Sequence, residues 1–222
     1  MGSTPAIIAD LASRIQRMEG HAPQSRASLP VLDWLLPVLP DGLNGGGCYA
    51  VDGSAALATA LLAAASAQGH WAAVVGIPDL GAEAAAAQGL DLSRTLLVPE
   101  PDEEWLTVMA TLIDVVPIVL TRLPTRLAPQ DAGRLEGRIR RQGSVLVVLI
   151  HDHQRWPRAT ATLQAGASTW AGLGRGRGGL AGRHLPVRVT ERSGQTRETV
   201  VWQHGTRFDS TAPEPSPLDV AG

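Results

Sequence analysis

Between residues 29 and 150, short apolar runs alternate with stretches of helical periodicity. The apolar runs predict strands at 48–51, 71–75, 95–98, 118–121 and 145–150. The stretches between them predict helices over 55–68, 80–88, 102–114 and 129–142, and Ser54 stands where it can cap the first. Strands without polar breaks are buried on both faces. The pattern therefore predicts an α/β fold with a mostly parallel sheet flanked by helices.

The pattern changes beyond residue 150. Segments 161–163, 185–191 and 196–202 are β-like, and the last two predict an antiparallel hairpin across Arg192-Ser193-Gly194-Gln195. From residue 206 the chain is rich in Pro, Ser and Asp. We therefore expect one core domain over 29–205 and a disordered tail over 206–222.

The N-terminal segment predicts an amphipathic helix over 4–20, followed by a linker over 21–28. Its apolar stripe includes Leu11, Ile15 and Met18. A short isolated helix is only marginally stable in water, so this stripe must pack against something. It packs on its own domain, on another copy of the chain, or on a partner protein, and we expect the helix to mediate docking.

Composition narrows the class of protein. The 222 residues are 44% hydrophobic and 18% charged, which fits one globular domain. A single cysteine, Cys48, excludes an internal disulfide. No apolar stretch approaches the roughly 20 residues that cross a bilayer, and the N-terminus lacks the layout of a signal peptide. We expect a soluble cytoplasmic protein with no membrane association.

Charge is strongly segregated along the chain. Residues 1–121 hold four arginines against thirteen acids, whereas residues 122–208 hold fifteen arginines against five acids. This asymmetry suggests an anionic partner for the C-terminal half, either nucleic acid or an acidic protein surface. The alternative is that the two halves neutralise each other in the folded protein.

The loop after the first strand stands where a nucleotide-binding protein of this class holds phosphate. A working P-loop reads G-x-x-x-x-G-K-[ST], and its lysine reaches the terminal phosphates. Here the corresponding residues are Asp52, Gly53 and Ser54, with Thr59 further on, and the chain contains no lysine at all. The loop is short, has one glycine and begins with an acid that repels phosphate.

Two further parts of a phosphoryl-transfer site are also missing. The strand at 118–121 is followed by Arg122 where an acid should hold magnesium, and the strand at 71–75 is followed by Gly76-Ile77-Pro78 where an acid should orient water. We therefore predict a nucleotide-hydrolase fold without catalysis, cofactor or metal. A different reaction that recruits Asp52, Asp79 or Asp114 is the enzymatic alternative.

Several segments carry a family resemblance. Residues 46–51, the alanine-rich helix, residues 67–75 and residues 90–101 resemble the core of the bacterial recombinase RecA. The segment Trp170-Ala171-Gly172-Leu173-Gly174-Arg175-Gly176-Arg177-Gly178-Gly179-Leu180 resembles the C-terminal signature of ImuA, the shortened RecA-like family of the error-prone repair cassette, called ImuA-prime in actinobacteria. The resemblance covers residues 5–205.

The resemblance implies an accessory protein of DNA-damage-induced mutagenesis, within the SOS response and translesion synthesis. Its implied partners are the polymerase-like protein ImuB, an error-prone DNA polymerase assembly and RecA itself, or another copy of the chain through the N-terminal helix. The missing lysine, the missing acids and the missing large C-terminal domain of RecA argue against filament formation driven by ATP.

Glycine and arginine residues after the core suggest an alternative. Arg175, Arg177, Arg183 and Arg188 could contact nucleic acid, which would make the chain a DNA-binding module. A glycine-rich turn before a hairpin also needs no ligand. His151-Asp152-His153 has no evident third metal ligand, so a plain loop is expected there. Cys48 is expected to be a small core residue.

Overall fold

The computed structural model describes residues 10, 28–151, 154–171, 182–205 and 207–210. Six parallel strands are β1 (Cys48–Asp52), β2 (Ala72–Val75), β3 (Thr95–Val98), β4 (Ile118–Arg122), β5 (Val145–Ile150) and β6 (Ala161–Ala165). Four antiparallel strands are β7 (Thr169–Ala171), β8 (Gly182–Glu191), β9 (Thr196–His204) and β10 (Arg207–Asp209). Together they form one sheet in the order β10-β9-β8-β6-β1-β5-β4-β2-β3, with β7 beside β8.

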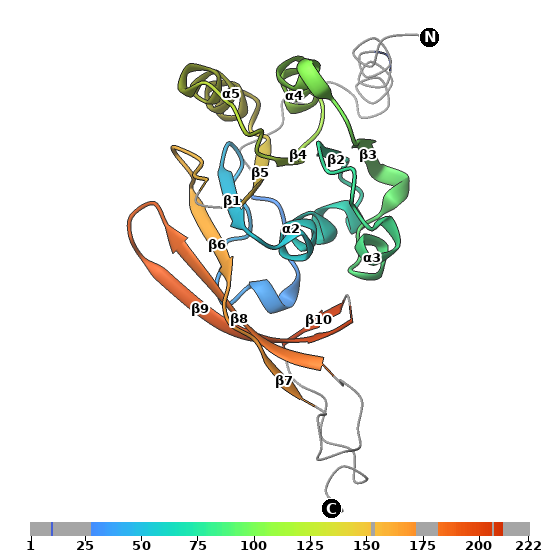
Figure 1. Ribbon diagram of the computed structural model, residues 1–222, viewed down its shortest axis with the longest axis vertical. Coiled ribbons are helices and arrows are strands. Elements are labelled where there is room, and N and C mark those ends of the chain that lie inside the picture. The colour runs from blue at the N-terminus through green and yellow to red at the C-terminus, as the bar shows by residue number, and fades with distance from the viewer. Residues whose placement is uncertain (1–9, 11–27, 152–153, 172–181, 206, 211–222) are drawn as a thin grey trace, which may run out of the picture.

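Helices cover both faces of the parallel strands. The α-helices are α2 (Ala55–Ala67), α3 (Ala82–Ala87), α4 (Trp105–Ile113) and α5 (Pro129–Gln142). Three short 3-10 turns are η1 (Asp33–Leu35), η2 (Leu92–Arg94) and η3 (Asp102–Glu104). Helices α2 and α3 and turn η1 pack on one face, whereas α4 and α5 pack on the other (Figure 1). Every residue of β2 and β5 is buried between these layers. The predicted α/β fold with a mostly parallel sheet is confirmed.

Local sequence explains why the helices begin where they do. The Ser54 side chain accepts a hydrogen bond from the Leu57 amide (3.2 Å) and caps α2, as predicted. Pro129 opens α5, and Gly143 ends it in the left-handed conformation at a φ of +73°. The predicted helix over 102–114 instead begins with the 3-10 turn η3, and the helix predicted over 80–88 is shorter at both ends.

The C-terminal strands extend the sheet beyond β6. The predicted hairpin is confirmed, since β8 and β9 pair antiparallel across residues 192–195. Strand β8 also pairs antiparallel with β6 and so joins the hairpin to the parallel strands. Apolar side chains of this hairpin, including Val187 and Val201, close the face that carries η1 and α2.

Two short strands were not predicted. Strand β7 pairs with the start of β8, and β10 pairs with the end of β9. Residues 207–209 fall in the tail predicted to be disordered, and for these three residues that prediction is wrong. The physical reason is Phe208, which is 8% exposed and packs against Trp34 with ring centroids 4.9 Å apart. The predicted helix over 4–20 and linker over 21–28 lie outside the described residues, except Asp10 and Ser28.

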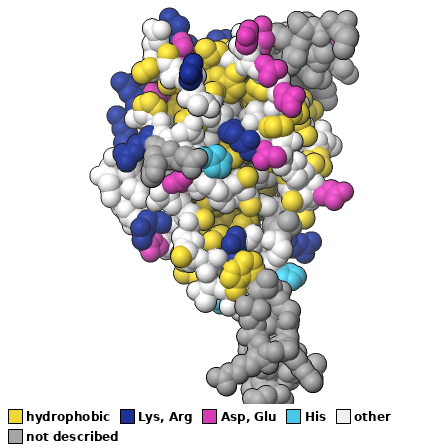
Figure 2. Space-filling view, viewed as in Figure 1, with side chains coloured by type: hydrophobic (Ala, Val, Ile, Leu, Met, Phe, Trp, Pro, Cys, Tyr) yellow, Lys and Arg dark blue, Asp and Glu magenta, His cyan; other side chains and the backbone are white. Residues whose placement is uncertain are grey.

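The segregated charge of the sequence persists in space. Figure 2 shows arginine side chains gathered along the edge formed by α5 and the β8–β9 hairpin, and acidic side chains gathered over α4 and β3 on the opposite side. Internal complementarity therefore accounts for only part of the asymmetry. No helix within the described ranges has the length and apolar character that crossing a membrane requires.

Candidate functional site

The carboxyl ends of the six parallel strands meet at one edge of the sheet. The chain leaves β1 towards α2 on one face, whereas it leaves β5 on the face that holds Trp156. Adjacent strands whose connections diverge in this way create the crevice where open parallel sheets bind ligands. The turn between β1 and α2 is therefore the candidate site.

This turn is closed by its own hydrogen bonds. The Gly53 amide donates to the Ile150 carbonyl oxygen at 2.9 Å, and Gly53 adopts a φ of +67° that favours glycine. The Leu57 amide donates to the Ser54 side chain, and the Ala58 amide donates to the Ser54 carbonyl oxygen at 3.0 Å. Two amides of the turn that could otherwise face a phosphate, those of Gly53 and Leu57, are thus bonded within the protein.

The polar side chains of the turn are also committed to local contacts. Asp52 accepts a hydrogen bond from the Gln164 amide group of β6 at 3.1 Å. Thr59 is only 2% exposed, and its hydroxyl donates to the Ala55 carbonyl oxygen at 2.8 Å. Of the predicted site residues, Asp52, Gly53 and Ser54 lie together at the crevice. Thr59 instead faces the packed side of α2.

A cation stands at the end of β4, where a hydrolase would hold magnesium. The Arg122 guanidinium donates to the Asp79 carboxylate at 2.6 Å. This hydrogen bond lowers the pKa of Asp79 below its ordinary value. Next to it, Thr121 is fully buried and accepts a hydrogen bond from the Trp105 indole at 2.9 Å. Because the acid beyond β2 is already paired with arginine, this end of the sheet does not fit a metal-bound triphosphate.

A cleft of about 500 Å³ lies beside the turn, between the ends of β1 and β6 and strand β8. Its lining residues are Asp52, Gly53, Gln164, Ala165, Gly166, Pro186, Val187, Arg188 and Glu198. The Arg188 guanidinium is paired with Glu198 across β8 and β9, which leaves Asp52 as the uncompensated charge. Because the cleft lining has a net negative charge, it repels a polyanion but can accept uncharged or cationic side chains of a partner.

Two of the four arginines predicted to contact DNA, Arg183 and Arg188, lie within the described residues, and the structure does not bring these two together on one face. Arg183 and Arg188 are five residues apart on β8, so their side chains point to opposite faces of the sheet. Arg183 donates to Gln203 at 2.8 Å and lies 5.2 Å from the centre of the Trp170 ring. Both side chains therefore already have partners within the described residues. Arg175 and Arg177 lie outside those residues, as do Leu11, Ile15 and Met18.

The other candidates have structural roles. Cys48 is 4% exposed, and burial, followed by the Glu136 charge, raises its pKa to about 12. It is therefore a protonated core thiol at neutral pH, as predicted. His151 is half-buried, whereas Asp152 and His153 lie outside the described residues. In the part of the chain that the structure describes, no three His, Cys, Asp or Glu side chains converge on one point.

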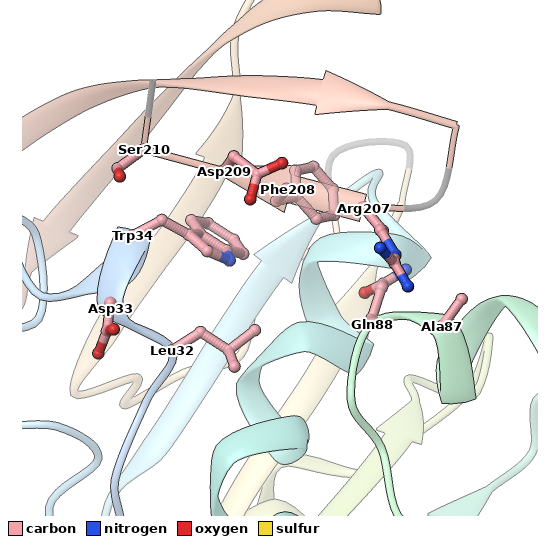
Figure 3. A pocket seen from close by; sticks show the side chains of 9 residues that line it. All are labelled: Leu32, Asp33, Trp34, Ala87, Gln88, Arg207, Phe208, Asp209 and Ser210. Carbon is pink, nitrogen blue, oxygen red and sulfur yellow. The ribbon is translucent and has the colours of Figure 1, made fainter. Parts of the chain in front are cut away.

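A second hollow, of about 340 Å³, connects the beginning and the end of the described chain. It lies between η1, the end of α3 and strand β10, and Figure 3 shows Trp34 beside Phe208 at its wall. Sequence reasoning missed this contact. The one usable signal was Phe208 itself, because a lone aromatic residue in a polar tail is typical of a segment that packs.

A family model described as the MT3502 N-terminal domain matches residues 37–158, which is more than half of the chain. The chain belongs to this family. The matched residues of this chain begin just after η1, run through β1–β5 and α2–α5, and end before β6. They therefore include the candidate site turn but not Gln164, Arg188 or Glu198.

A relative of this chain comes from Mycobacterium tuberculosis (strain ATCC 25618 / H37Rv). It is the uncharacterized protein Rv3395c, which is 35% identical over 121 residues. The match covers 54% of this chain and 59% of the relative. The chain therefore matches less than two thirds of the length of Rv3395c.

Proposed function

We propose that the protein is a non-catalytic, RecA-like accessory protein of the DNA-damage-induced mutagenesis complex, of the ImuA type. In this role it binds an ImuB-like polymerase-fold protein and helps to position an error-prone DNA polymerase. It acts by holding proteins in place and uses no cofactor. The proposal rests on the residue pattern that resembles ImuA and on the geometry of the candidate site.

The observation that carries the proposal is the closed turn after β1. The Gly53 amide is bonded to Ile150, the helix cap uses Ser54, and Arg122 is paired with Asp79. Phosphoryl transfer depends on positioning and on charge stabilisation by amides, a cation and a metal. The Gly53 and Leu57 amides are bonded internally, Asp79 is paired with Arg122, and the chain contains no lysine. These features support a fold that keeps the position of a nucleotide site without its phosphate-binding groups.

Exposed apolar side chains support a role in protein binding. Leu92 and Leu97, in η2 and in the edge strand β3, are 40% and 47% exposed. Apolar residues at an exposed sheet edge are typical of protein contacts. Figure 2 shows acidic side chains gathered on the side of the molecule that carries β3. The cleft beside Asp52 offers a second place for partner side chains.

Calorimetric titration with ATP and magnesium tests the absence of nucleotide chemistry, with RecA as the positive control. We expect no binding heat from this protein. Micromolar affinity together with ATP turnover would refute the proposal.

Co-purification with the ImuB-like protein tests the partner. Replacing Leu11 and Ile15 by glutamate should remove the complex if the apolar stripe of the N-terminal helix docks on it, while circular dichroism reports an intact core. Replacing Arg14 and Arg17 of the same segment by serine is the matched control and should leave the complex intact. Survival of the complex in the Leu11 and Ile15 variant would assign that stripe to packing on its own domain.

A further inference from the structure

A group of exposed arginines lies at the amino ends of the parallel strands, at the opposite edge of the sheet from the candidate site. We call it the arginine surface. Its members are Arg140, Arg141, Arg155, Arg158 and Arg192. They come from α5, from the connection between β5 and β6, and from the turn between β8 and β9.

Hydrogen bonds and an ion pair hold these three elements together. Thr160 accepts a hydrogen bond from the Cys48 amide through its side chain (3.1 Å) and another from the Arg192 amide through its carbonyl oxygen (2.9 Å). On the other side, the Arg158 guanidinium lies 4.0 Å from the Glu136 carboxylate of α5. The arginine surface is therefore continuous around the start of β1 and β6.

Of the five arginines of this surface, the nearby acids neutralise only Arg158, through Glu136. Asp114 is hydrogen-bonded to Arg138, and Glu191 is paired with Arg197, so each already has another arginine as partner. Glu136 is buried at 3% side-chain exposure. Among the described residues, no salt bridge within 4.0 Å involves Arg140, Arg141, Arg155 or Arg192. The surface thus carries uncompensated positive charge.

The chemistry of the surface selects among anionic partners. Protein interfaces have an apolar centre with aromatic anchors, whereas contacts to a phosphate backbone need only cationic and polar groups. The large apolar side chains that the described residues expose all lie elsewhere, at Leu36, Leu92, Leu97, Leu106, Trp170 and Val200. Single-stranded nucleic acid requires aromatic side chains for base stacking, and Trp156, the aromatic residue nearest in sequence to Arg155 and Arg158, is buried.

We infer that the arginine surface binds the phosphate backbone of double-stranded nucleic acid without reading its sequence. This inference is independent of the proposed function, because it uses neither the β1 turn nor the apolar stripe of the N-terminal helix. A failed complex with the ImuB-like protein would leave it standing, and the reverse also holds.

Fluorescence anisotropy with a labelled duplex DNA of about 20 base pairs tests the inference, between about 50 and 200 mM salt. The test variant combines Arg140→Gln, Arg141→Gln and Arg192→Gln. The control variant combines Arg94→Gln, Arg126→Gln and Arg207→Gln, and it removes the same charge from exposed side chains on other surfaces. We expect the test variant to bind about tenfold more weakly or worse. Its salt slope should fall by about 1 for each phosphate that an arginine no longer reaches.

The control variant should stay within about twofold of the wild type, and both variants should keep the wild-type melting temperature. Duplex RNA is a second arm: binding of both duplexes supports a shared backbone contact, and binding of one identifies the nucleic acid. Several results would overturn the inference. They are no binding of either duplex by the wild type at low salt, equal weakening in both variants, tighter binding of a single strand, or arginine-dependent binding of poly-glutamate as tight as that of duplex.

Discussion

At the scale of single residues, Glu136 is the most exceptional side chain of the fold. Its carboxylate is buried between α5 and the core, and neither oxygen accepts a hydrogen bond from a described residue. The nearest cation is the exposed Arg158, whose Nε lies 4.0 Å away. Removing one partner of a buried ion pair is costly because the other charge is left alone, whereas replacing both by apolar groups is often neutral.

We therefore predict opposite effects of one and two substitutions at this pair. Arg158→Gln should lower the free energy of unfolding by about 1 to 3 kcal/mol, and adding Glu136→Leu should restore it to the wild-type value or above. Urea denaturation of the wild type and both variants measures this. A double variant that is less stable than Arg158→Gln alone would show that Glu136 stabilises the fold independently of Arg158.

Asp114 gives a prediction for pH dependence. Burial acts to raise the pKa of Asp114, but hydrogen bonds from Arg138 and Gln142 outweigh it, so its pKa lies below the ordinary value. Such a group stabilises the folded state above its unfolded pKa of about 3.9 and loses this contribution as the pH falls through the lower folded value. Asp114→Asn should therefore cost about 1 kcal/mol at neutral pH, and the difference from wild type should shrink below about pH 3.9.

Urea titrations at neutral pH and at about pH 3 measure the effect of Asp114→Asn. Asp131→Asn is the control, because Asp131 pairs with the 75% exposed Arg134 and should change stability by less than about 0.5 kcal/mol. A loss from Asp114→Asn that is equally large at both pH values would contradict the assigned cause.

At the scale of secondary-structure elements, α5 contains two glycines within its helical span. A methyl group added at Gly133 would meet no atom within 4 Å. At Gly182 of β8, by contrast, a Cβ would come within 2.5 Å of the Trp202 ring and 2.7 Å of the Gln203 carbonyl oxygen. Gly133 therefore weakens a helix without a packing reason, whereas Gly182 is needed because the Trp202 ring lies against the strand.

Alanine substitutions should separate these two cases. Gly133→Ala should raise the free energy of unfolding by about 0.5 to 1 kcal/mol through helix propensity. Gly182→Ala should lower it by about 1 to 3 kcal/mol through overpacking. Thermal unfolding followed by circular dichroism gives both signs, and a destabilising Gly133→Ala would mean that the exposed face of α5 is covered in the native protein.

The success of sequence reasoning varies with the kind of element. The central strands between residues 48 and 150 were predictable because a parallel strand buried on both faces is an unbroken apolar run, as in β5. Strands β7 and β10 are three residues long and mostly exposed, so their pairing depends on β8 and β9 and leaves no periodic signal. At the site, the absence of lysine was visible in the sequence. The bond from Gly53 to Ile150 was not, because it joins residues from different strands.

At the scale of the whole molecule, the sheet continues past the residues that the family model matches. Family similarity ends at residue 158, yet β6 pairs with β1 immediately afterwards, and β8 pairs with β6. Leu163, Leu185 and Val187 from this later part are buried in the same core as α2. The two parts therefore share one core and should unfold together.

We predict that a chain ending at residue 160 does not fold cooperatively. It would leave β1 as an unpaired sheet edge and would expose the core face that the hairpin covers. Urea denaturation followed by tryptophan fluorescence and by far-ultraviolet circular dichroism is the measurement. The full chain should give one coincident transition by both probes. A sharp transition in the truncated chain would show that the part matched by the family is an independent folding unit.

The contact between Trp34 and Phe208 indicates that the chain can be circularly permuted. Leu32 and Ser210 line the same hollow, so the first and last segments of the folded core lie close together (Figure 3). A short peptide bridge there, with new ends opened between Ser193 and Gly194 in the exposed β8–β9 turn, would give a circular permutant with every strand pairing intact.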